Sequence, residues 1–374
     1  MYKLTLTCKV ITPMFMSGAD GNTPELRPSE FKGMIRFWWR AIKAENNIEN
    51  LRKEEAEIFG GTREKEGKSK VTIKVYPQPI ERYIGNNIQT DYKLNWRFDS
   101  NTNSLIGTDA GIGYLLYSTV LNRKEVKYIK PDFQFNIQIS SYDEYAFKNA
   151  IASLWIAIYL GGFGKRSRRG GGNISVLKAE GESYGLSFIL PNISNKTNLK
   201  KQLEDNLKIT FSFINSFIKK ENAQTEYPNL KDARIVILDP KESWYEALNI
   251  IGRLFKDFRE KNKFDIFNMG AFGMPIMHNK HRVRIVPYSK NNEKRLSERM
   301  ASPLIIKLIR ADNNYFPILI KLSTTLPLAG KEEKTKDVWI KKEIREIEMS
   351  KIDEFINKIK SKEEIYIWVG MIIF

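Results

Sequence analysis

Apolar side chains recur along this chain with two spacings, and the spacing separates strands from helices. Alternation of apolar and polar residues predicts a strand with one buried face, and recurrence every three to four positions predicts a helix. In the first half these patterns predict a strand at 2–11, a helix from Ser29 to about Ala44, strands at 71–76 and 133–140, a helix at 145–160 and a strand at 173–177. This order, β-α-β-β-α-β, is that of a ferredoxin-like unit.

The second half repeats the order. It is predicted to contain a strand at 233–238, a helix at 243–259, strands at 304–310 and 315–323, a helix near 351–360 and a strand at 365–374. We therefore predict an α+β protein with two tandem ferredoxin-like, RRM-like domains. Their predicted ranges are 1–190, with an insertion at about 80–131, and 233–374, with a connecting helical segment at 191–232. The highly charged stretch 331–348 is predicted to be a solvated loop that leads into a helix.

One loop of the first domain combines glycine with positive charge. Residues 161–172 read GGFGKRSRRGGG and follow the helix predicted at 145–160. Glycine lets backbone amides approach an anion closely, and Lys165, Arg166, Arg168 and Arg169 supply charge, a combination that suits the phosphates of nucleic acid. The helix-to-strand order around the loop is the reverse of that in nucleotide-binding glycine motifs. A solvated basic turn is the alternative interpretation.

The helix that begins at Ser29 is predicted to carry a second basic surface. Its apolar stripe, which should face the sheet, consists of Phe31, Met34, Ile35, Trp38 and Ile42. A different side carries Lys32, Arg36, Arg40 and Lys43. Trp39 lies at the boundary, where it either packs in the core or stacks on RNA bases. Cations that contact phosphates beside an indole that stacks on bases would form a surface for single-stranded nucleic acid.

The composition narrows the class of protein. The 374 residues include 61 Lys and Arg against 44 Asp and Glu, a net charge of +17, which favours a polyanionic partner. No apolar stretch is long enough to span a membrane, and the N-terminus lacks the apolar segment of a signal peptide, so we expect a cytoplasmic protein without a membrane partner. The single cysteine, Cys8, excludes an internal disulfide and is predicted to lie in the core.

Few residues suggest catalysis. His278 and His281, the only histidines, have helical spacing but no Cys or acidic cluster beside them, so we expect no metal site there. Asp20, in the sequence SGADG, could act as an acid or metal ligand, although a turn-forming aspartate beside glycine is the more common role. No serine or cysteine forms a recognisable triad with either histidine.

These motifs together resemble a known family. The residues 12–20 (TPMFMSGAD), 25–28 (ELRP) and 32–40 (KGMIRFWWR), with the glycine-rich loop, resemble RAMP proteins of CRISPR systems. The closest resemblance is to the tandem-RAMP subunits of the type III-B Cmr complex, an RNA-guided effector. The segments 272–276 (FGMPI) and 299–304 (RMASPL) extend the resemblance to the second half.

The resemblance implies a place in a complex with guide RNA, other RAMP subunits and a large polymerase-like subunit. It also implies a position near the 3′ end of the guide, where the subunit would help to capture target RNA in antiviral defence without cutting it. RAMP enzymes that process RNA often use a histidine near the first helix. This sequence has no histidine there, which favours RNA binding over catalysis, and no cofactor is expected. The alternative is a metal-assisted RNA endonuclease that uses Asp20. The predicted RNA-binding residues are Lys32, Arg36, Trp39, Arg40, Lys43, Lys165, Arg166, Arg168 and Arg169.

Overall fold

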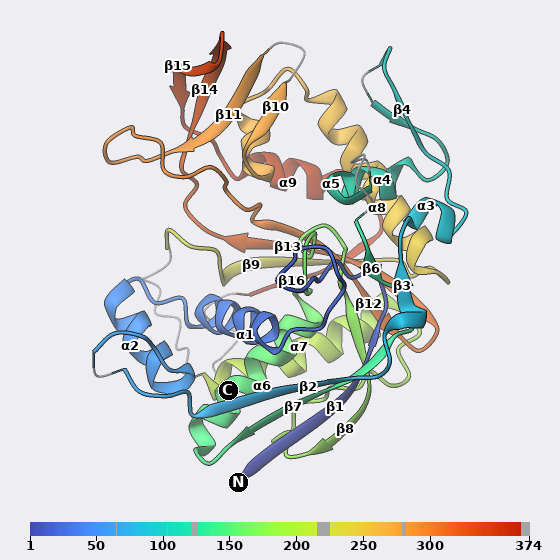
Figure 1. Ribbon diagram of the computed structural model, residues 1–374, viewed down its shortest axis with the longest axis vertical. Coiled ribbons are helices and arrows are strands. Elements are labelled where there is room, and N and C mark those ends of the chain that lie inside the picture. The colour runs from blue at the N-terminus through green and yellow to red at the C-terminus, as the bar shows by residue number, and fades with distance from the viewer. Residues whose placement is uncertain (65, 103, 121–125, 215–224, 279–281, 368–374) are drawn as a thin grey trace.

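Sheets and helices alternate in layers along the long axis of the molecule (Figure 1). The computed structural model describes residues 1–64, 66–102, 104–120, 126–214, 225–278 and 282–367. It is a mixed α+β structure whose three four-stranded sheets are antiparallel.

The first sheet has one buried and one solvated face. Its strands β1 (Tyr2–Val10), β2 (Val71–Pro77), β7 (Gln134–Ser141) and β8 (Ile174–Gly181) lie in the order β2-β7-β1-β8. In β1, Leu4, Leu6 and Cys8 are buried, as the alternation in the sequence predicts. Helices α1 (Pro28–Lys43) and α6 (Glu144–Tyr159) pack on this buried side.

The second sheet is buried on both faces. It consists of β9 (Asn229–Leu238), β12 (Leu304–Ala311), β13 (Asn314–Ser323) and β16 (Lys362–Tyr366), in the order β12-β13-β9-β16. Ile235 and Ile237 point toward α1, α6 and α7 (Lys196–Phe213), whereas Val236 packs toward α8 (Trp244–Lys261) and α9 (Ser350–Asn357). Helices of the first half therefore share one core with strands of the second half.

A third sheet corrects the prediction for 331–348. This stretch is not a solvated loop but most of the hairpin β14 (Leu328–Thr335) and β15 (Val338–Arg345), which joins β10 (Ile276–His278) and β11 (Val283–Tyr288) in the order β10-β11-β14-β15. Charged side chains pair across these strands, which hides the strand pattern in the sequence. The buried Glu332 accepts hydrogen bonds from Arg284 Nε (2.7 Å) and the Tyr288 hydroxyl (2.9 Å).

The segment between β2 and β7 packs mainly on the second half. Its elements are a 3₁₀ turn η1 (Glu81–Tyr83), β3 (Ile84–Gly85), α3 (Ile88–Asp91), β4 (Arg97–Asp99), β5 (Ser104–Ile106), α4 (Ala110–Leu115), α5 (Tyr117–Val120) and β6 (Tyr128–Ile129). Helix α4 approaches α8 so closely that a Cβ on Gly252 would lie 2.3 Å from the carbonyl oxygen of Gly111. Elsewhere, α2 (Ile48–Phe59) follows α1, and a second 3₁₀ turn, η3 (Asn268–Phe272), precedes β10.

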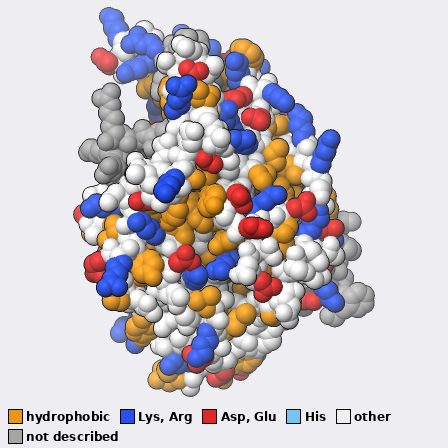
Figure 2. All heavy atoms as spheres, turned by 90° about the vertical axis from the view of Figure 1, so that its right-hand side faces the viewer, with side chains coloured by type: hydrophobic (Ala, Val, Ile, Leu, Met, Phe, Trp, Pro, Cys, Tyr) orange, Lys and Arg blue, Asp and Glu red, His pale blue; other side chains and the backbone are white. Residues whose placement is uncertain are grey.

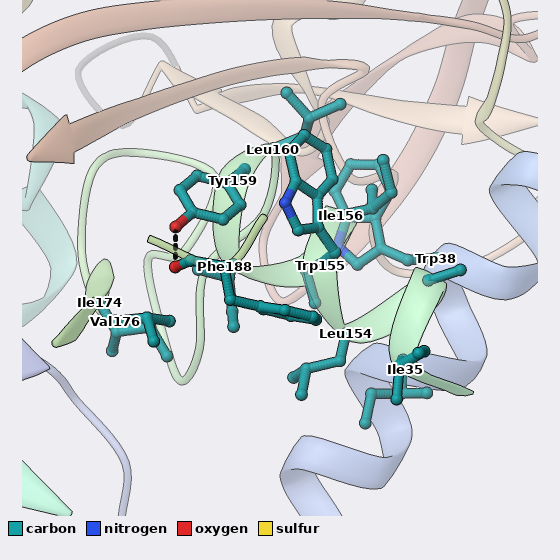
Figure 3. Packing of buried hydrophobic residues seen from close by; sticks show 14 of the residues in the cluster. Ile35, Trp38, Leu154, Trp155, Ile156, Tyr159, Leu160, Ile174, Val176 and Phe188 are labelled. Atoms are coloured by element: carbon teal, nitrogen blue, oxygen red, sulfur yellow. Dashed lines mark hydrogen bonds between the residues drawn. The ribbon is translucent and has the colours of Figure 1, made fainter. Parts of the chain in front are cut away.

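The helix layer between the first two sheets is packed mainly by apolar side chains. Figure 3 shows the Trp38 side chain of α1 near those of α6, and Trp38 is fully buried, which confirms its predicted core position. The Tyr159 hydroxyl donates a hydrogen bond to Phe188 O (2.7 Å). Cys8 is also buried, and burial raises the pKa of its thiol. No helix among the described residues is long and apolar enough to cross a membrane.

Candidate nucleic-acid interface

The glycine-rich loop 161–172 packs against the segment that follows strand β1. Its backbone donates hydrogen bonds from Lys165 N to Phe15 O (2.8 Å) and from Gly172 N to Pro13 O (2.9 Å). At Gly172 φ is +63°, and a Cβ there would lie 1.7 Å from the carbonyl oxygen of Phe163, so only glycine fits. The glycines thus shape a tightly packed loop.

Arg168 and Arg169 connect this loop to the second sheet. Arg169 donates hydrogen bonds to Leu304 O (2.9 Å) and Phe272 O (2.7 Å), and Arg168 donates to Ser302 O. The backbone adds a bond from Ile306 N to Arg168 O (3.1 Å), on the edge strand β12. Burial lowers the pKa of both guanidinium groups. These bonds engage both arginines between the two halves of the chain, and Arg169 uses both of its Nη atoms, so fewer donors remain for RNA phosphates than the sequence predicts.

Lys165 and Arg166 remain available in the same loop. Lys165 is exposed, and Arg166 has a buried Nε that finds no hydrogen-bond partner in the described chain. Burial lowers the pKa of Arg166, and the nearby charge of Arg299 lowers it further. No carboxylate of the described residues forms an ion pair with Arg166 or Arg299. Two neighbouring guanidinium groups without a counter-ion are an arrangement that a phosphate would stabilise.

Arg299 is a cation that the sequence-based list of RNA-binding residues did not include. It is exposed and lies next to Met300, whose backbone pairs with Met274. In the sequence, the segment 299–304 is distinguished only by its resemblance to family sequences. Sequence alone could not place Arg299 beside the loop, since it lies 133 positions after Arg166.

The basic side chains of α1 lie close together, but carboxylates of α2 partly neutralise them. Glu55 of α2, only 5% exposed, accepts hydrogen bonds from Arg36 Nε (2.6 Å) and Arg40 Nη1 (2.5 Å). Lys43 pairs with Glu54 (2.5 Å). Lys32 is half-buried, and its pKa is lowered by burial and by the charge of Arg36.

Both arginines of this cluster keep part of their surface in solvent. The side chains of Arg36 and Arg40 remain 36% and 35% exposed. The surface of α1 is therefore still basic, with less free charge than the sequence indicated.

Trp39 is a core residue, which corrects its place among the candidate stacking residues. Its side chain is fully buried, and its indole Nε1 donates a hydrogen bond to Asn149 Oδ1 of α6 (2.8 Å). The ring packs edge-on against Phe59, with 6.3 Å between ring centroids. No face of the indole is open to a base.

Asp20 has the geometry of a turn residue. Its carboxylate accepts hydrogen bonds from the backbone of Asn22 (3.0 Å) and Thr23 (3.0 Å) and from the Thr23 hydroxyl. These bonds lower its pKa to about 2, the hydroxyl bond most of all. Among the described residues no three His, Cys, Asp or Glu side chains are placed to hold a metal ion. His281 lies outside the described residues.

The loop and the start of α1 lie side by side. The positive charges of Arg27 and Lys165 both act on Glu30 in the first turn of α1, although burial is the larger influence and raises the pKa of Glu30. Lys165 also donates a hydrogen bond to Gly21 O (3.4 Å). Positive charge is not uniform over the molecule, since Figure 2 shows a face where acidic and apolar side chains separate the lysines and arginines. A basic interface must therefore be assigned to particular elements.

Comparisons with known proteins match both the sequence and the fold. The model of the RAMP superfamily matches residues 7–175. The CRISPR system Cmr subunit Cmr1-2 of Pyrococcus furiosus is 35% identical over 190 residues, which are 47% of this chain and 96% of that protein. The subunit Cmr1-1 of the same organism is 25% identical over 265 residues, which are 67% of this chain and 70% of that protein.

Solved structures share the fold over nearly the whole chain. The crystal structure of Cmr1 from Pyrococcus furiosus in its apo form has a TM-score of 0.63 at 20% identity and covers 98% of this chain and 99% of that one. A chain in the cryo-EM structure of the Type III-B Cmr-beta bound to cognate target RNA has a TM-score of 0.55 at 16% identity, with coverages of 96% and 98%.

Proposed function

The chain belongs to the RAMP superfamily, as a relative of the Cmr1 subunits of CRISPR systems, and from this premise we propose that it is an RNA-binding subunit of a type III-B effector complex. Its partners would be guide RNA, target RNA, the other RAMP subunits and the large polymerase-like subunit. Its place would be near the 3′ end of the guide, where it helps to capture target RNA.

The pair of arginines at the glycine-rich loop supports this proposal most strongly. Arg166 and Arg299 are close enough to lower the pKa of Arg166, and Arg166 Nε is buried without a partner. Together with the exposed Lys165 they form what we call the loop cluster. An RNA phosphate would neutralise the two adjacent charges at once. Lys32, Arg36, Arg40 and Lys43 of α1 would add weaker contacts to the backbone of the same strand.

We propose that this binding is not catalytic. The Asp20 carboxylate, the best acidic candidate, is engaged by Asn22 and Thr23 in its own turn. A metal-assisted cleavage mechanism would need those oxygens for the metal or the reacting water. Incubation of RNA with the purified chain and Mg²⁺ or Mn²⁺ should leave the RNA intact, and loss of a cleavage activity on Asp20→Ala would instead favour the endonuclease alternative.

We also infer that each half is a ferredoxin-like RAMP unit, at 1–190 and 233–374. In both sheets the four strands of the β-α-β-β-α-β series lie in the order fourth, first, third, second. In each series a helix follows the first strand (α1, with α2 after it, and α8), and another follows the third strand (α6 and α9).

RNA titration of loop-cluster variants tests the proposed function. We expect the parent to bind single-stranded RNA with a slope of log affinity against log salt near −3, about 0.7 for each of roughly four phosphate contacts. Replacing Lys165, Arg166 and Arg299 by alanine should reduce the magnitude of that slope by about 2.

The matched control removes charge from another element. Lys201 and Lys208 are exposed on α7, and their replacement by alanine should leave the slope close to that of the parent. Thermal melting of each variant separates lost binding from lost folding. A loop-cluster variant that melts normally and binds RNA like the parent would refute this site.

A further inference from the structure

The outer face of the first sheet is a broad polar surface that the proposed loop site does not use. Its outward positions are exposed or half-buried, in contrast to the fully buried inner positions such as Leu6 and Ile137. Figure 1 places β1, β2, β7 and β8 at one end of the molecule, with the helix layer on one side of the sheet only. We define the outer face as Lys3, Thr5, Thr7 and Lys9 of β1, Thr72, Lys74 and Tyr76 of β2, Gln134, Asn136, Gln138 and Ser140 of β7, and Lys178 and Glu180 of β8.

The central strands of the outer face offer hydrogen bonds without negative charge. In the register of β1 and β7, Thr5 lies opposite Gln138 and Thr7 lies opposite Asn136. Amide and hydroxyl side chains both donate and accept, so they can bond the edges of unpaired bases. Solvation alone requires only that the side chains on a sheet face be polar, whatever their charge. On this face no outward position of the two central strands carries an acidic residue.

Cations lie on the strands around this neutral centre. Lys3 and Lys74 form no ion pair within the part of the chain that the structure describes. Lys178 pairs with Glu180 (2.8 Å), the single acidic residue of the outer face, and Lys9 pairs with Asp132 (2.7 Å) at its margin. The surplus of positive charge is complementary to a phosphate backbone.

One row across the strands has the features of a nucleotide path. The backbone register aligns Tyr76 of β2, Asn136 of β7, Thr7 of β1 and Lys178 of β8. Tyr76 is 46% exposed, and Lys178 lies at the opposite edge of the sheet. Four strands span roughly 14 Å at about 4.8 Å per strand, which suits a few unpaired nucleotides.

We propose that the outer face is a second contact surface for single-stranded RNA, separate from the loop cluster. It rests on the proposed function, because the ligand is again RNA. In this arrangement Tyr76 stacks on one base, Asn136 and Thr7 bond base edges, and the lysines contact phosphates. The chain would then touch RNA at two places on different sides of the α1 and α6 layer.

Two variants test the outer face, each with a matched control. Lys3→Ala with Lys74→Ala should reduce the magnitude of the salt slope by about 0.7, because the loop cluster accounts for about three of the roughly four phosphate contacts and leaves one for the outer face. Lys201→Ala with Lys208→Ala removes the same charge from α7 and should leave the slope unchanged. Tyr76→Ala should weaken binding about fivefold or more if a base stacks there, whereas Tyr142→Ala, at an 86% exposed tyrosine, should not.

Photocrosslinking of uridine-containing RNA supplies a readout that does not depend on affinity. Crosslinks mapped to Tyr76 or its neighbours on β7, and retained in the Lys165, Arg166 and Arg299 variant, would support two surfaces. The proposal is overturned if the parent binds RNA but both outer-face variants match their controls and no crosslink maps there. It is equally overturned if another subunit, not RNA, protects this face from hydrogen exchange in the assembled complex. Failure of the parent to bind RNA at all would instead overturn the proposed function.

Discussion

Arg166 and Arg169 are three residues apart in one loop, yet their guanidinium groups have different surroundings. Arg169 satisfies its donors with the carbonyl oxygens of Leu304 and Phe272, and Arg166 has a buried Nε without a partner. The sequence could predict that the loop is basic, but it could not separate these roles. The difference depends on β12 and η3, which come more than a hundred residues later.

This contrast gives a paired prediction. Arg169→Ala should cost about 2–4 kcal/mol of unfolding free energy, because two buried carbonyl groups lose their donor and the stem of the side chain loses its packing. Arg166→Ala should cost much less stability but should weaken RNA binding. Urea denaturation beside RNA titration checks both, and equal effects of the two substitutions on each property would contradict the assignment.

Lys307 is a second residue whose surroundings have a measurable consequence. Its side chain is fully buried on β12, where its Nζ donates a hydrogen bond to Ile158 O near the C-terminus of α6. Burial lowers its pKa well below the ordinary value of about 10.4. Between the folded and unfolded pKa the unfolded chain binds more protons, so this residue makes stability rise with pH in that range.

Lys307→Met should remove that rise. The free energy of unfolding of the parent, minus that of the variant, should increase from pH 7 toward pH 10. Urea denaturation at each pH measures the free energy of unfolding of both proteins. Their difference no longer contains the contribution of the tyrosines and Cys8, because both proteins share these residues. Parallel pH curves would mean that Lys307 stays charged in the folded protein throughout the range, because the unfolded chain keeps this lysine charged up to about pH 10.

At the level of elements, segments with a strong apolar periodicity could be predicted from the sequence, and segments rich in charged residues could not. Strand β1 and helices α1 and α6 lie within a residue or two of their predicted ranges. The β14–β15 hairpin was not predicted, because its charged residues are typical of a solvated segment. The cross-strand partners Arg284 and Tyr288, which stabilise the buried Glu332, can be identified only from the structure. Helix α2 was missed as well, and it supplies the Glu55 that holds two cations of α1.

Glu55 therefore offers a test of the basic surface of α1. Glu55→Gln should release Arg36 and Arg40 from their shared carboxylate and so tighten RNA binding at low salt, by about 0.5–1 kcal/mol. The same change should lower stability, since the bonds between the two helices weaken. Anisotropy titrations at several salt concentrations check the first effect, and unchanged or weaker binding in a folded variant would show that α1 does not face RNA.

At the level of the whole molecule, the two halves share a core although the sequence suggests a tandem arrangement. Helix α6 is buried on nearly all sides, as expected for a helix that is apolar all round. It contacts the first sheet on one side, and strands of the second sheet belong to the same apolar cluster. Sequence periodicity could identify both units but not this arrangement, because a helix that is apolar all round does not indicate which element covers each side.

A fragment of residues 1–190 should accordingly be insoluble or should bind hydrophobic dyes. It would lack β9, β12, β13 and β16, which bury the far side of the helix layer. Co-expression with residues 191–374 should restore solubility if the two pieces reassemble. A monomeric, cooperatively melting 1–190 fragment would contradict the shared core.

The burial of the central sheet on both faces also constrains how the chain matures on the ribosome. The ribosome synthesises the segment from β1 through α6 well before β9. Strand β9 is in turn synthesised before β16, with which it pairs at the edge of the sheet. During that interval the apolar helix surface that the second sheet will cover is exposed in the nascent chain, and chaperones bind such surfaces. The pace at which the second half emerges therefore governs the yield of assembly-competent subunit, and synonymous codons that slow translation between α6 and β9 prolong the vulnerable period.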